Sequence, residues 1–381
     1  MPRNPRRSLP FLMFLFGLAA LACGVARVRA ASDAPATQPA QSKSDPKASA
    51  ASACARCHVE AKTQPLTQMG RALELPGSNP TVVTHPRLAF QKAGYSYLVE
   101  TRDGKTNYSV TDGTRTLAIP VLWSLGAGNQ TWVLEYDGKL YESLVSYYLA
   151  IDGLDITTGD ESIKPKTLEE AMGRPIDDRE KKACFGCHST NSVTDGQVNL
   201  EHLHPGVECS HCHEGTAQHL ADTVRGVDGP TPPALSKLAS EDISNFCGQC
   251  HRTWETVIRG PWRGEVNVRF QPYRLANSRC FDGADPRISC VACHNPHQPL
   301  NRDKAFYDAK CLACHAAGAT ALQHAVAVGQ SAPIANGAKV CPVAKDNCVS
   351  CHMPRVNMLG GHLTFTDHQI RVVKPGIPYP N

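Results

Sequence analysis

The chain has 381 residues, a length that suggests two or three domains. Because 41% of the residues are hydrophobic and only 6% are aromatic, side chains alone would form a thin core. The 17 cysteines and 16 histidines indicate disulfides, metal sites or covalent haem, and no internal apolar run reaches the ~18 residues of a membrane span, which excludes a polytopic membrane protein. The formal charge is +4, but residues 1–30 hold five arginines and no acid, and the rest of the chain carries 34 basic against 35 acidic side chains. This balance argues against nucleic acid as a partner.

Residues 1–30 are predicted to be a signal peptide. Arg6 and Arg7 precede an apolar run at 11–16, and Val28-Arg29-Ala30 fits the small-residue rule for cleavage after Ala30. The protein is therefore expected in the periplasm or another exported location, where disulfides persist and c-type haem is attached. Two alternatives are a lipoprotein modified at Cys23 and an uncleaved leader that anchors the chain in a membrane. Residues 31–52 are small, polar and rich in proline, which predicts a flexible tether.

The sequence C-x-x-C-H occurs seven times and uses fourteen of the seventeen cysteines. On one helical turn, positions i, i+3 and i+4 share a face, so two cysteines can form thioether bonds to a porphyrin beside a histidine that binds the iron. Zinc does not require a histidine directly after the second cysteine, and a disulfide requires none. The sequence therefore predicts seven covalent c-type haems. Motifs 1 to 7, in chain order, are Cys54/Cys57/His58, Cys184/Cys187/His188, Cys209/Cys212/His213, Cys247/Cys250/His251, Cys290/Cys293/His294, Cys311/Cys314/His315 and Cys348/Cys351/His352.

Seven apolar macrocycles would supply the core that the side chains lack. The predicted fold is mainly α with much irregular structure, built as short helices and loops packed on haem, and the haem-free chain should be largely unfolded. A first haem segment at 53–75 and a hexahaem domain at 166–381 are the expected units. Haem propionates would make the exported protein acidic, so redox partner proteins with basic docking surfaces are expected.

Residues 76–165 contain no haem motif and show strand signals. Alternating stretches such as 95–99 and 131–136 are separated by Asp-Gly pairs at 103–104, 112–113 and 137–138, which favour hairpin turns. This pattern predicts a small antiparallel β-meander inserted after the first haem. It would cover haem edges or form a docking surface for a partner or substrate.

Nine histidines outside the motif position are candidates for the sixth ligand of the irons. The best placed are His219, His297, His362 and His368, because each follows a motif closely. His202 and His204 precede motif 3, and at least one should bind iron. His85 and His324 are weaker candidates, and His211, which lies between two thioether cysteines, is expected to be structural.

The segment Gly206-Val207-Glu208-Cys209-Ser210-His211-Cys212-His213 through His219 resembles the G-V-x-C-x-x-C-H-G-P-G-x-x-H element of periplasmic multihaem cytochromes. That superfamily includes hydroxylamine oxidoreductase, its tetrahaem electron acceptor and the pentahaem nitrite reductases. The resemblance implies that His219 binds a haem, although Glu214-Gly215-Thr216 replaces G-P-G. It also implies a ligand eleven residues after motif 1, where Met69 stands in place of the usual histidine.

Two functions remain open. In one, the chain transfers electrons along its haems; this is favoured because eight histidines and Met69 could saturate seven irons. In the other, it is a multihaem oxidoreductase with one open iron that acts on a small nitrogen or sulfur oxyanion or a hydroxylamine-like substrate. The resembling nitrite reductases carry a lysine in place of the motif histidine at their catalytic haem, and all seven motifs here end in histidine. The two cysteines left over, Cys280 and Cys341, are expected to form a disulfide.

Overall fold

A computed structural model describes residues 50–316, 341–358, 361–374, 376 and 379. The expected signal peptide with Cys23, nearly all of the tether and His324 lie outside the described residues. Within them, no helix is both long enough and apolar enough to cross a membrane.

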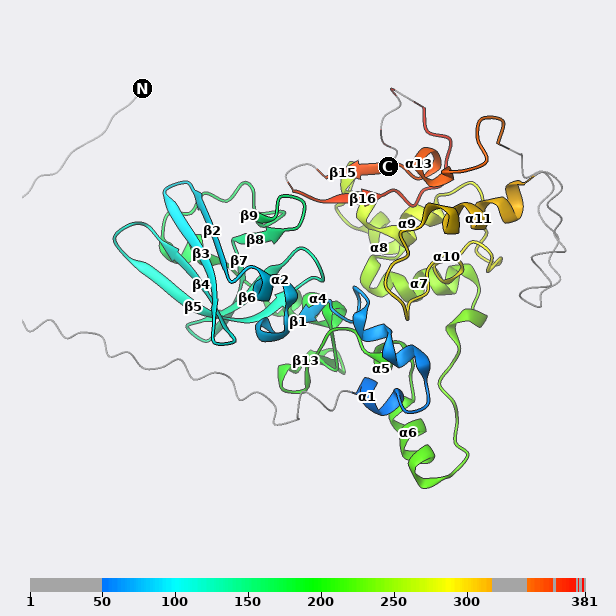
Figure 1. The fold of residues 1–381 in the computed structure, drawn as a ribbon, viewed down its shortest axis with the longest axis horizontal. Helices are drawn as coiled ribbons and strands as arrows, with labels where there is room; N and C mark the ends of the chain where they lie inside the picture. Colours follow the sequence, from blue (N-terminus) through cyan, green and yellow to red (C-terminus); the bar gives the residue numbers. More distant parts are fainter. Residues whose placement is uncertain (1–49, 317–340, 359–360, 375, 377–378, 380–381) are drawn as a thin grey trace, which may run out of the picture. The chain divides into compact units, whose positions relative to one another are not determined.

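An antiparallel sheet of eight strands occupies the region after motif 1 (Figure 1). The strand order is β10-β7-β6-β5-β4-β3-β2, and β1 pairs with β5 on the side of this path. A separate hairpin is formed by β8 (Val145–Tyr148) and β9 (Gly153–Ile156). The strands of the sheet are β1 (Leu73–Glu74), β2 (Arg87–Lys92), β3 (Tyr95–Arg102), β4 (Lys105–Thr111), β5 (Thr116–Leu125), β6 (Thr131–Tyr136), β7 (Lys139–Ser143) and β10 (Gly173–Pro175).

The expected Asp-Gly turns join neighbouring strands of this sheet. Asp103-Gly104 connects β3 to β4, and Asp137-Gly138 connects β6 to β7, with positive φ at both residues of each pair. This is the backbone that a type I′ hairpin requires. At the β4–β5 turn, the Asp112 side chain instead accepts hydrogen bonds from the N–H groups of Thr114 and Arg115, both at 2.8 Å.

The expectation of a mainly α chain with a small meander is too narrow. The sheet reaches beyond 76–165 at both ends, because Leu73 pairs with Leu125 and Gly173 pairs with Ser143. These terminal strands are two or three residues long, too short for an alternating pattern to reveal them. The described chain therefore combines a substantial sheet with the expected short helices.

The largest side-chain core lies against this sheet. It contains fully buried aromatic and aliphatic side chains, among them Tyr108, Trp132 and Leu134, all at 0% exposure. Helices α2 (Pro80–Thr84) and α3 (Leu168–Met172) contribute Val82 and Met172 to the same core. The sheet region can therefore bury its own apolar surface without haem.

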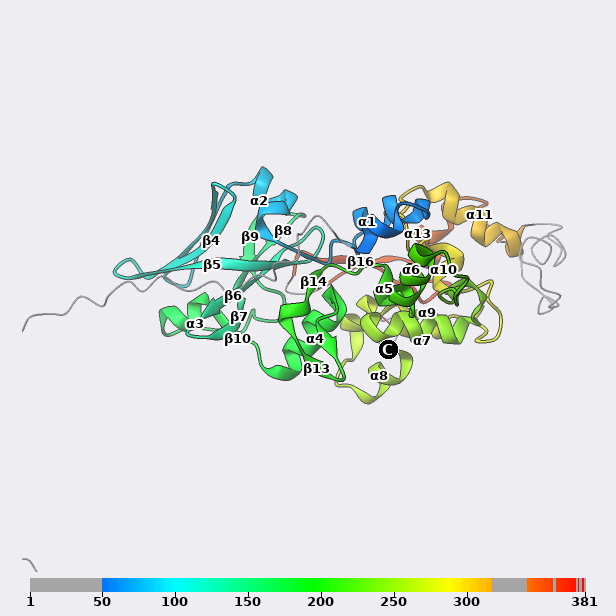
Figure 2. The same cartoon turned by 90° about the horizontal axis from the view of Figure 1, so that it is seen from below.

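The segments that carry the motifs are short helices joined by irregular chain (Figure 2). Their side-chain cores are small: one cluster consists of Val257, Phe270 and Tyr273 with Trp262 against it.

The motif-bearing helices are α1 (Ala50–Cys54), α4 (Asp178–His188), α5 (Cys209–Cys212), α7 (Ser240–His251), α10 (Cys290–Cys293), α11 (Lys304–His315) and α13 (Cys348–His352). Between them lie α6 (Thr216–Arg225), α8 (Trp254–Arg259) and α9 (Gln271–Ala276). The short strands are β11 (Ser189–Thr190), β12 (Val193–Thr194), β13 (Gln197–Val198), β14 (His204–Pro205), β15 (Arg355–Asn357) and β16 (Thr364–Thr366), and the 3₁₀ helices are η1 (Val59–Lys62), η2 (Gln64–Leu66), η3 (Pro76–Ser78), η4 (Leu200–His202), η5 (Leu235–Lys237) and η6 (Gly264–Arg269).

A buried ion pair fastens the C-terminal segment to helix α9. The Arg274 guanidinium donates through Nε and Nη2 to the two oxygens of Asp367, at 2.9 and 3.0 Å, and both side chains are fully buried. Burial alone would raise the pKa of Asp367, but the hydrogen bonds from Arg274 lower it below its ordinary value. Because His368 follows Asp367 directly, this pair fixes the position of a predicted iron ligand.

The division between a side-chain core and haem segments makes a prediction for the haem-free chain. When haem attachment is prevented, amides of β3 to β6 should keep their protection from hydrogen exchange, whereas amides of α7 and α11 should exchange rapidly. Peptide-resolved hydrogen exchange on the haem-free and haem-loaded chains measures this. Equal loss of protection in both regions would show that the sheet also depends on haem.

Breaking the buried ion pair should be costly. Arg274→Met removes the two-bond partner of the buried Asp367 carboxylate and leaves Arg371 as its remaining ion-pair partner, so the free energy of unfolding should fall by up to about 3–5 kcal/mol. In the unmodified protein, the contribution of Asp367 is present above the ordinary carboxyl pKa and is lost as the pH falls through its lowered pKa. The matched control is Arg87→Met, which removes an exposed pair with Glu100 at 3.0 Å and should leave the free energy of unfolding nearly unchanged, because water screens exposed pairs. Denaturant titration of both variants would contradict the prediction if their losses were equal.

Candidate haem-binding sites

Each motif is formed on a helical turn, as its spacing predicts. The backbone N–H of the motif histidine donates to the carbonyl of the first cysteine, at 2.9 Å in motifs 1 and 3 and at 2.8 Å in motif 5. This is the i to i−4 bond of an α-helix, so both thiols and the imidazole lie on one side of the turn. The donor set therefore fits two thioether bonds and one iron ligand on a single macrocycle.

Five motif histidines direct Nδ1 toward an oxygen of the protein. His188 and His352 contact the carbonyls of Ala72 and Arg371, both at 2.9 Å. His213, His251 and His294 contact Pro233 O, Gln271 Oε1 and Tyr307 Oη, at 3.3, 3.2 and 3.4 Å. A hydrogen bond at Nδ1 fixes the tautomer in which Nε2 carries the lone pair for a metal. These imidazoles are therefore oriented to bind iron through Nε2.

Three histidines from outside the motifs face motif histidines across a similar gap. The ring centroids of His58 and His219 are 6.4 Å apart. Those of His213 and His297 are 6.0 Å apart, and those of His294 and His368 are 6.1 Å apart. Each pair joins a motif to a segment predicted to supply a sixth ligand.

The surroundings of three of these imidazoles, His294, His297 and His368, favour the neutral form. Burial and the neighbouring His294 lower the pKa of His368 to about 4. Burial also lowers the pKa of His294, and burial with the nearby His213 lowers that of His297. Only a neutral imidazole can give its lone pair to a metal, so at neutral pH these side chains are ready to act as ligands.

The seven motifs form a continuous spatial series. Motif 1 meets motif 3 at Cys54 and Cys209, and α1 packs against α5. Motif 3 adjoins motif 4 at Cys212 and Cys247, while motif 2 joins motif 4 where α4 packs against α7 and Cys187 meets Cys250.

The second half of the series continues from motif 4. Cys247 lies beside Cys290 of motif 5, and α7 packs against α10. Cys293 of motif 5 adjoins Cys311 of motif 6. Helix α11 of motif 6 packs against α13 of motif 7, where Cys311 meets Cys348. No motif is isolated from its neighbours.

Two of the fourteen cysteines predicted to bind haem differ from the others in their exposure to solvent. Cys57 of motif 1 and Cys351 of motif 7 are exposed, whereas the other twelve are half-buried. In these two motifs the first cysteine, Cys54 or Cys348, contacts the neighbouring motif, and the second is exposed to solvent. The spacing C-x-x-C-H fixes the turn but not what packs over it, so the sequence could not separate Cys57 and Cys351 from the enclosed cysteines.

Asp308 holds the last two motifs together. It lies on α11, and its carboxylate accepts hydrogen bonds from the backbone N–H groups of Asn347 and Cys348, at 2.6 and 2.8 Å. Burial alone would raise the pKa of Asp308, and these donors lower it below its ordinary value. The carboxylate therefore caps the first turn of α13 from the helix of motif 6.

The segment after motif 1 crosses the chain just before motif 3 at close range. Val207 N–H donates to the carbonyl of Met69 at 3.0 Å, and Gln64 Nε2 donates to the carbonyl of Val207 at 2.6 Å. Gly206 has a φ of +79°, and a Cβ there would collide with the backbone oxygen of Gly70. Met69 is thus held at this crossing by its backbone, with its side chain half-buried.

Two other predicted ligands make hydrogen bonds to carboxylates through Nε2. His85 contacts Asp152 at 2.9 Å and, through Nδ1, the carbonyl of Thr81 at 3.0 Å. His362 contacts Asp155 at 2.9 Å and so joins the C-terminal segment to the β8–β9 hairpin. In this arrangement neither Nε2 is available to a metal. The sequence could not show this, because Asp155 lies 207 residues away from His362.

The remaining candidates near motif 3 differ in environment. His202 is exposed, whereas His204 is half-buried and contacts Glu208 through Nδ1 at 3.3 Å. That contact leaves Nε2 of His204 free among the described interactions. His211 lies inside the turn of motif 3, as expected.

The expected disulfide is absent, because Cys280 and Cys341 are both free thiols. Cys280 lies near Cys314 and Cys311 of motif 6. The thiol of Cys341 is instead bonded by the backbone N–H groups of Ala344 and Val343, which lower its pKa. Counting unused cysteines could not reveal these separate surroundings.

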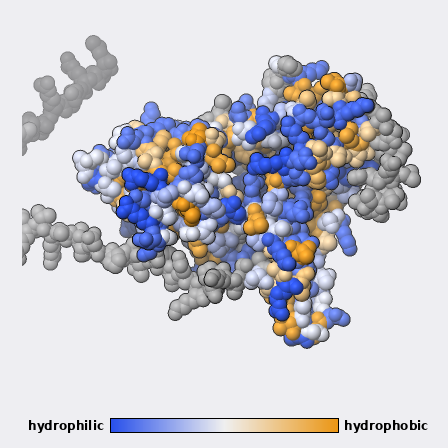
Figure 3. Space-filling model, in the orientation of Figure 1, coloured by the Kyte–Doolittle hydropathy of each residue, from blue (hydrophilic) through white to orange (hydrophobic). Residues whose placement is uncertain are grey.

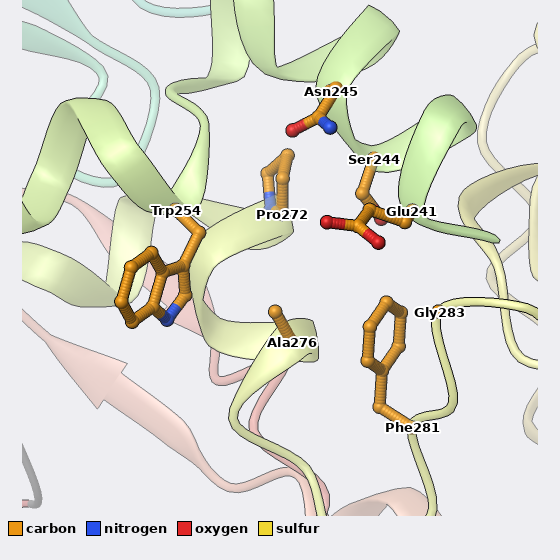
Figure 4. A pocket seen from close by; sticks show the side chains of 8 residues that line it. All are labelled: Glu241, Ser244, Asn245, Trp254, Pro272, Ala276, Phe281 and Gly283. Atoms are coloured by element: carbon orange, nitrogen blue, oxygen red, sulfur yellow. The ribbon is translucent and has the colours of Figure 1, made fainter.

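Apolar surface is available beside two of the motifs. A cavity of about 220 Å³ lies between α7 and α9, where Trp254, Pro272, Ala276 and Phe281 provide rings and methyl groups (Figure 4). Ser244 also lines it and lies beside the Cys290 thiol of motif 5. Such a lining suits the edge of an apolar macrocycle.

Helix α6 and the short segment after it expose a second apolar surface. Leu220, Val224 and Val227 are exposed by 37%, 73% and 53%, and Figure 3 shows orange patches among blue ones over this helix. The same helix carries His219, which faces His58 of motif 1. The residues around both motifs therefore fit covalent haem, in the ligands they offer and in the apolar contacts they leave available.

A family match agrees with this chemistry. Residues 156–214, which contain motif 2 and motif 3, match the family described as cytochrome c554 and c-prime. Among solved structures, the outer cell wall cytochrome OcwA is similar at 15% identity and a TM-score of 0.41, over 84% of this chain and 79% of its own. No curated protein matches the chain. The family match and the repeated motif together support a multihaem c-type cytochrome that carries covalently bound haem and transfers electrons.

Proposed function

We propose that the chain is an exported heptahaem cytochrome that passes electrons along a series of closely spaced haems, and that it is related to the superfamily of hydroxylamine oxidoreductase and the pentahaem nitrite reductases. The continuous contact between motifs carries this proposal, because each attachment site adjoins at least one other. Haems fixed at adjacent turns would have neighbouring edges. Electrons could then move between them without a diffusing carrier.

We also propose three axial ligand pairs. Two imidazoles on opposite sides of one metal, each bonded at about 2.0–2.1 Å and each with its ring centre roughly 1.1 Å further away, have centroids ~6.3 Å apart. The three observed separations, from 6.0 to 6.4 Å, fit this arrangement. His219 would then complete the iron of motif 1, His297 that of motif 3 and His368 that of motif 5.

The ligand count still favours electron transfer. With His85 and His362 bonded to carboxylates, seven of the nine candidates remain for seven irons: the three paired histidines, His202, His204, His324 and Met69. A haem with two strong ligands exchanges electrons but offers a small molecule no coordination position. The alternative, an oxidoreductase for a small nitrogen or sulfur oxyanion, requires one iron to stay open.

The exposed cysteines agree with such a series. A thioether bond does not require a buried sulfur, so Cys57 and Cys351 can still attach haem. Their exposure would leave one edge of the haems of motifs 1 and 7 toward solvent. Electrons could therefore enter or leave the series at these two haems.

An acidic exported cytochrome would meet redox partner proteins through basic surfaces on those partners. The proposed leader would deliver the chain to the periplasm or cell exterior, with a membrane or lipid anchor as the alternative to cleavage. The mass of the mature chain distinguishes these forms.

Haem number and coordination test the proposed function directly. The intact mass should exceed that of the mature polypeptide by seven haems, and the spectrum should be low-spin at every iron. Carbon monoxide added to the reduced protein and cyanide added to the oxidised protein should leave the spectrum unchanged. A high-spin fraction near one-seventh that binds nitrite or hydroxylamine would instead establish the oxidoreductase.

The ligand pairs predict the effect of single substitutions. His219→Ala, His297→Ala and His368→Ala should each convert one haem to a high-spin form that binds carbon monoxide, because each removes one strong axial ligand. His85→Ala is the matched control and should change no haem, since both nitrogens of His85 contact protein oxygens. Electronic and magnetic circular dichroism spectra report the spin state. If any of the first three variants stays fully low-spin, that ligand pair is wrong.

A further inference from the structure

Two arginines beside motif 4, Arg252 and Arg269, are connected through a pair of contacting aromatic rings. Arg252 directly follows His251, and its charge acts on the thiols of Cys187 and Cys250 in motifs 2 and 4. Arg269 is close enough to Arg252 that partial burial and this like charge lower its pKa. Within the described part of the chain, neither guanidinium forms an ion pair. Two like charges held together disfavour each other unless an anion lies between or beside them.

Aromatic rings hold both guanidiniums in place. The Arg252 Cζ lies 5.3 Å from the ring centre of Trp262, and the Arg269 Cζ lies 5.4 Å from that of Phe270. The two rings contact each other edge to face, with centroids 5.3 Å apart. Each cation therefore lies within the range of a cation–π contact, and the pair of rings links the two arginines into one unit.

The backbone at Arg252 has a strained conformation. Its φ is +66° and its ψ is +116°, a conformation that a residue with a side chain adopts at a cost of about 1–3 kcal/mol. The strain redirects the chain immediately after the motif 4 histidine and points to a requirement at this residue. Arg259, seven residues later on α8, is by contrast 79% exposed and bonded to Glu255 at 2.7 Å.

We propose that Arg252 and Arg269 form an oxyanion-binding site beside motif 4. Its ligand is a planar carboxylate group, which either a haem propionate or free formate supplies. The planar fork of each guanidinium can donate two parallel hydrogen bonds to such a group. A propionate occupant depends on the haem proposed at motif 4, whereas a free anion does not.

Charge at this site should be visible in the haem potentials. In the double variant R252Q/R269Q, loss of positive charge disfavours the reduced state, and one haem should be about tenfold harder to reduce, a shift of about 59 mV for one electron. The control R259Q removes one charge nearby and should shift no haem comparably. The single variants R252Q and R269Q decide the result if the double variant does not mature, and the intact mass confirms that seven haems are retained.

The pH dependence separates the two occupants. If the occupant is a propionate, removing its cations raises the propionate pKa. The potential in R252Q/R269Q should then fall as the pH rises through that pKa, while R252K/R269K and R259Q show no new dependence. If the occupant is free, formate added to the oxidised wild-type protein should bind saturably by calorimetry, and this binding should be lost in R252Q/R269Q.

Either response supports the oxyanion site, and the absence of both overturns it. Potentials and pH profiles in R252Q/R269Q equal to those of R259Q, with no saturable formate binding to the wild-type protein, would show that the arginines bind no anion. If peptide mapping by mass spectrometry revealed no haem on motif 4 while formate still bound, the proposed function would fail at this motif and the site would stand.

Discussion

One turn of helix, repeated seven times, is the constraint on which the haem segments depend. It brings two thiols and an imidazole to one side, and the bond from the histidine N–H to the first cysteine carbonyl holds the turn closed. At five motifs, a protein oxygen also fixes Nδ1. The turn positions the motif histidine, and the hydrogen bond at Nδ1 leaves Nε2 as the nitrogen that can bind the iron.

The chain uses two different kinds of core. Around β2 to β7, aromatic and aliphatic side chains bury one another, as Tyr108, Trp132 and Leu134 show. The motif segments have only small side-chain clusters of their own, although Phe185 of α4 packs into a cluster with Val133 and Leu140 of the sheet, and they place apolar side chains next to cysteines. A flat prosthetic group can satisfy such surfaces, so the same chain can build one region from side chains and another around its cofactor.

Contacts between distant segments connect the sheet region to the motif segments and the motif segments to one another. His362 reaches Asp155 of the β8–β9 hairpin, Thr63 donates to the carbonyl of His297 at 2.6 Å, and Arg274 holds Asp367 beside His368. The last two contacts fix the backbone of histidines that face a motif histidine. Ligand position is therefore set by polar contacts around the histidine as well as by its place in the sequence. The same contacts limit how far one haem segment can move relative to the next.

The sequence alone determined the attachment chemistry and the principal hairpins, because both depend on residues close together in the chain. C-x-x-C-H needs one turn, and the Asp-Gly hairpins need one pair of positive φ angles each. Only the tertiary structure showed that β1 and β10 extend the sheet, that Cys280 and Cys341 are not bridged, and that His362 bonds to Asp155. It also decided which histidines face each other and which motif cysteines stay exposed. Those outcomes depend on where remote segments pack, and a local pattern contains no information about the distance between residues that are hundreds of positions apart.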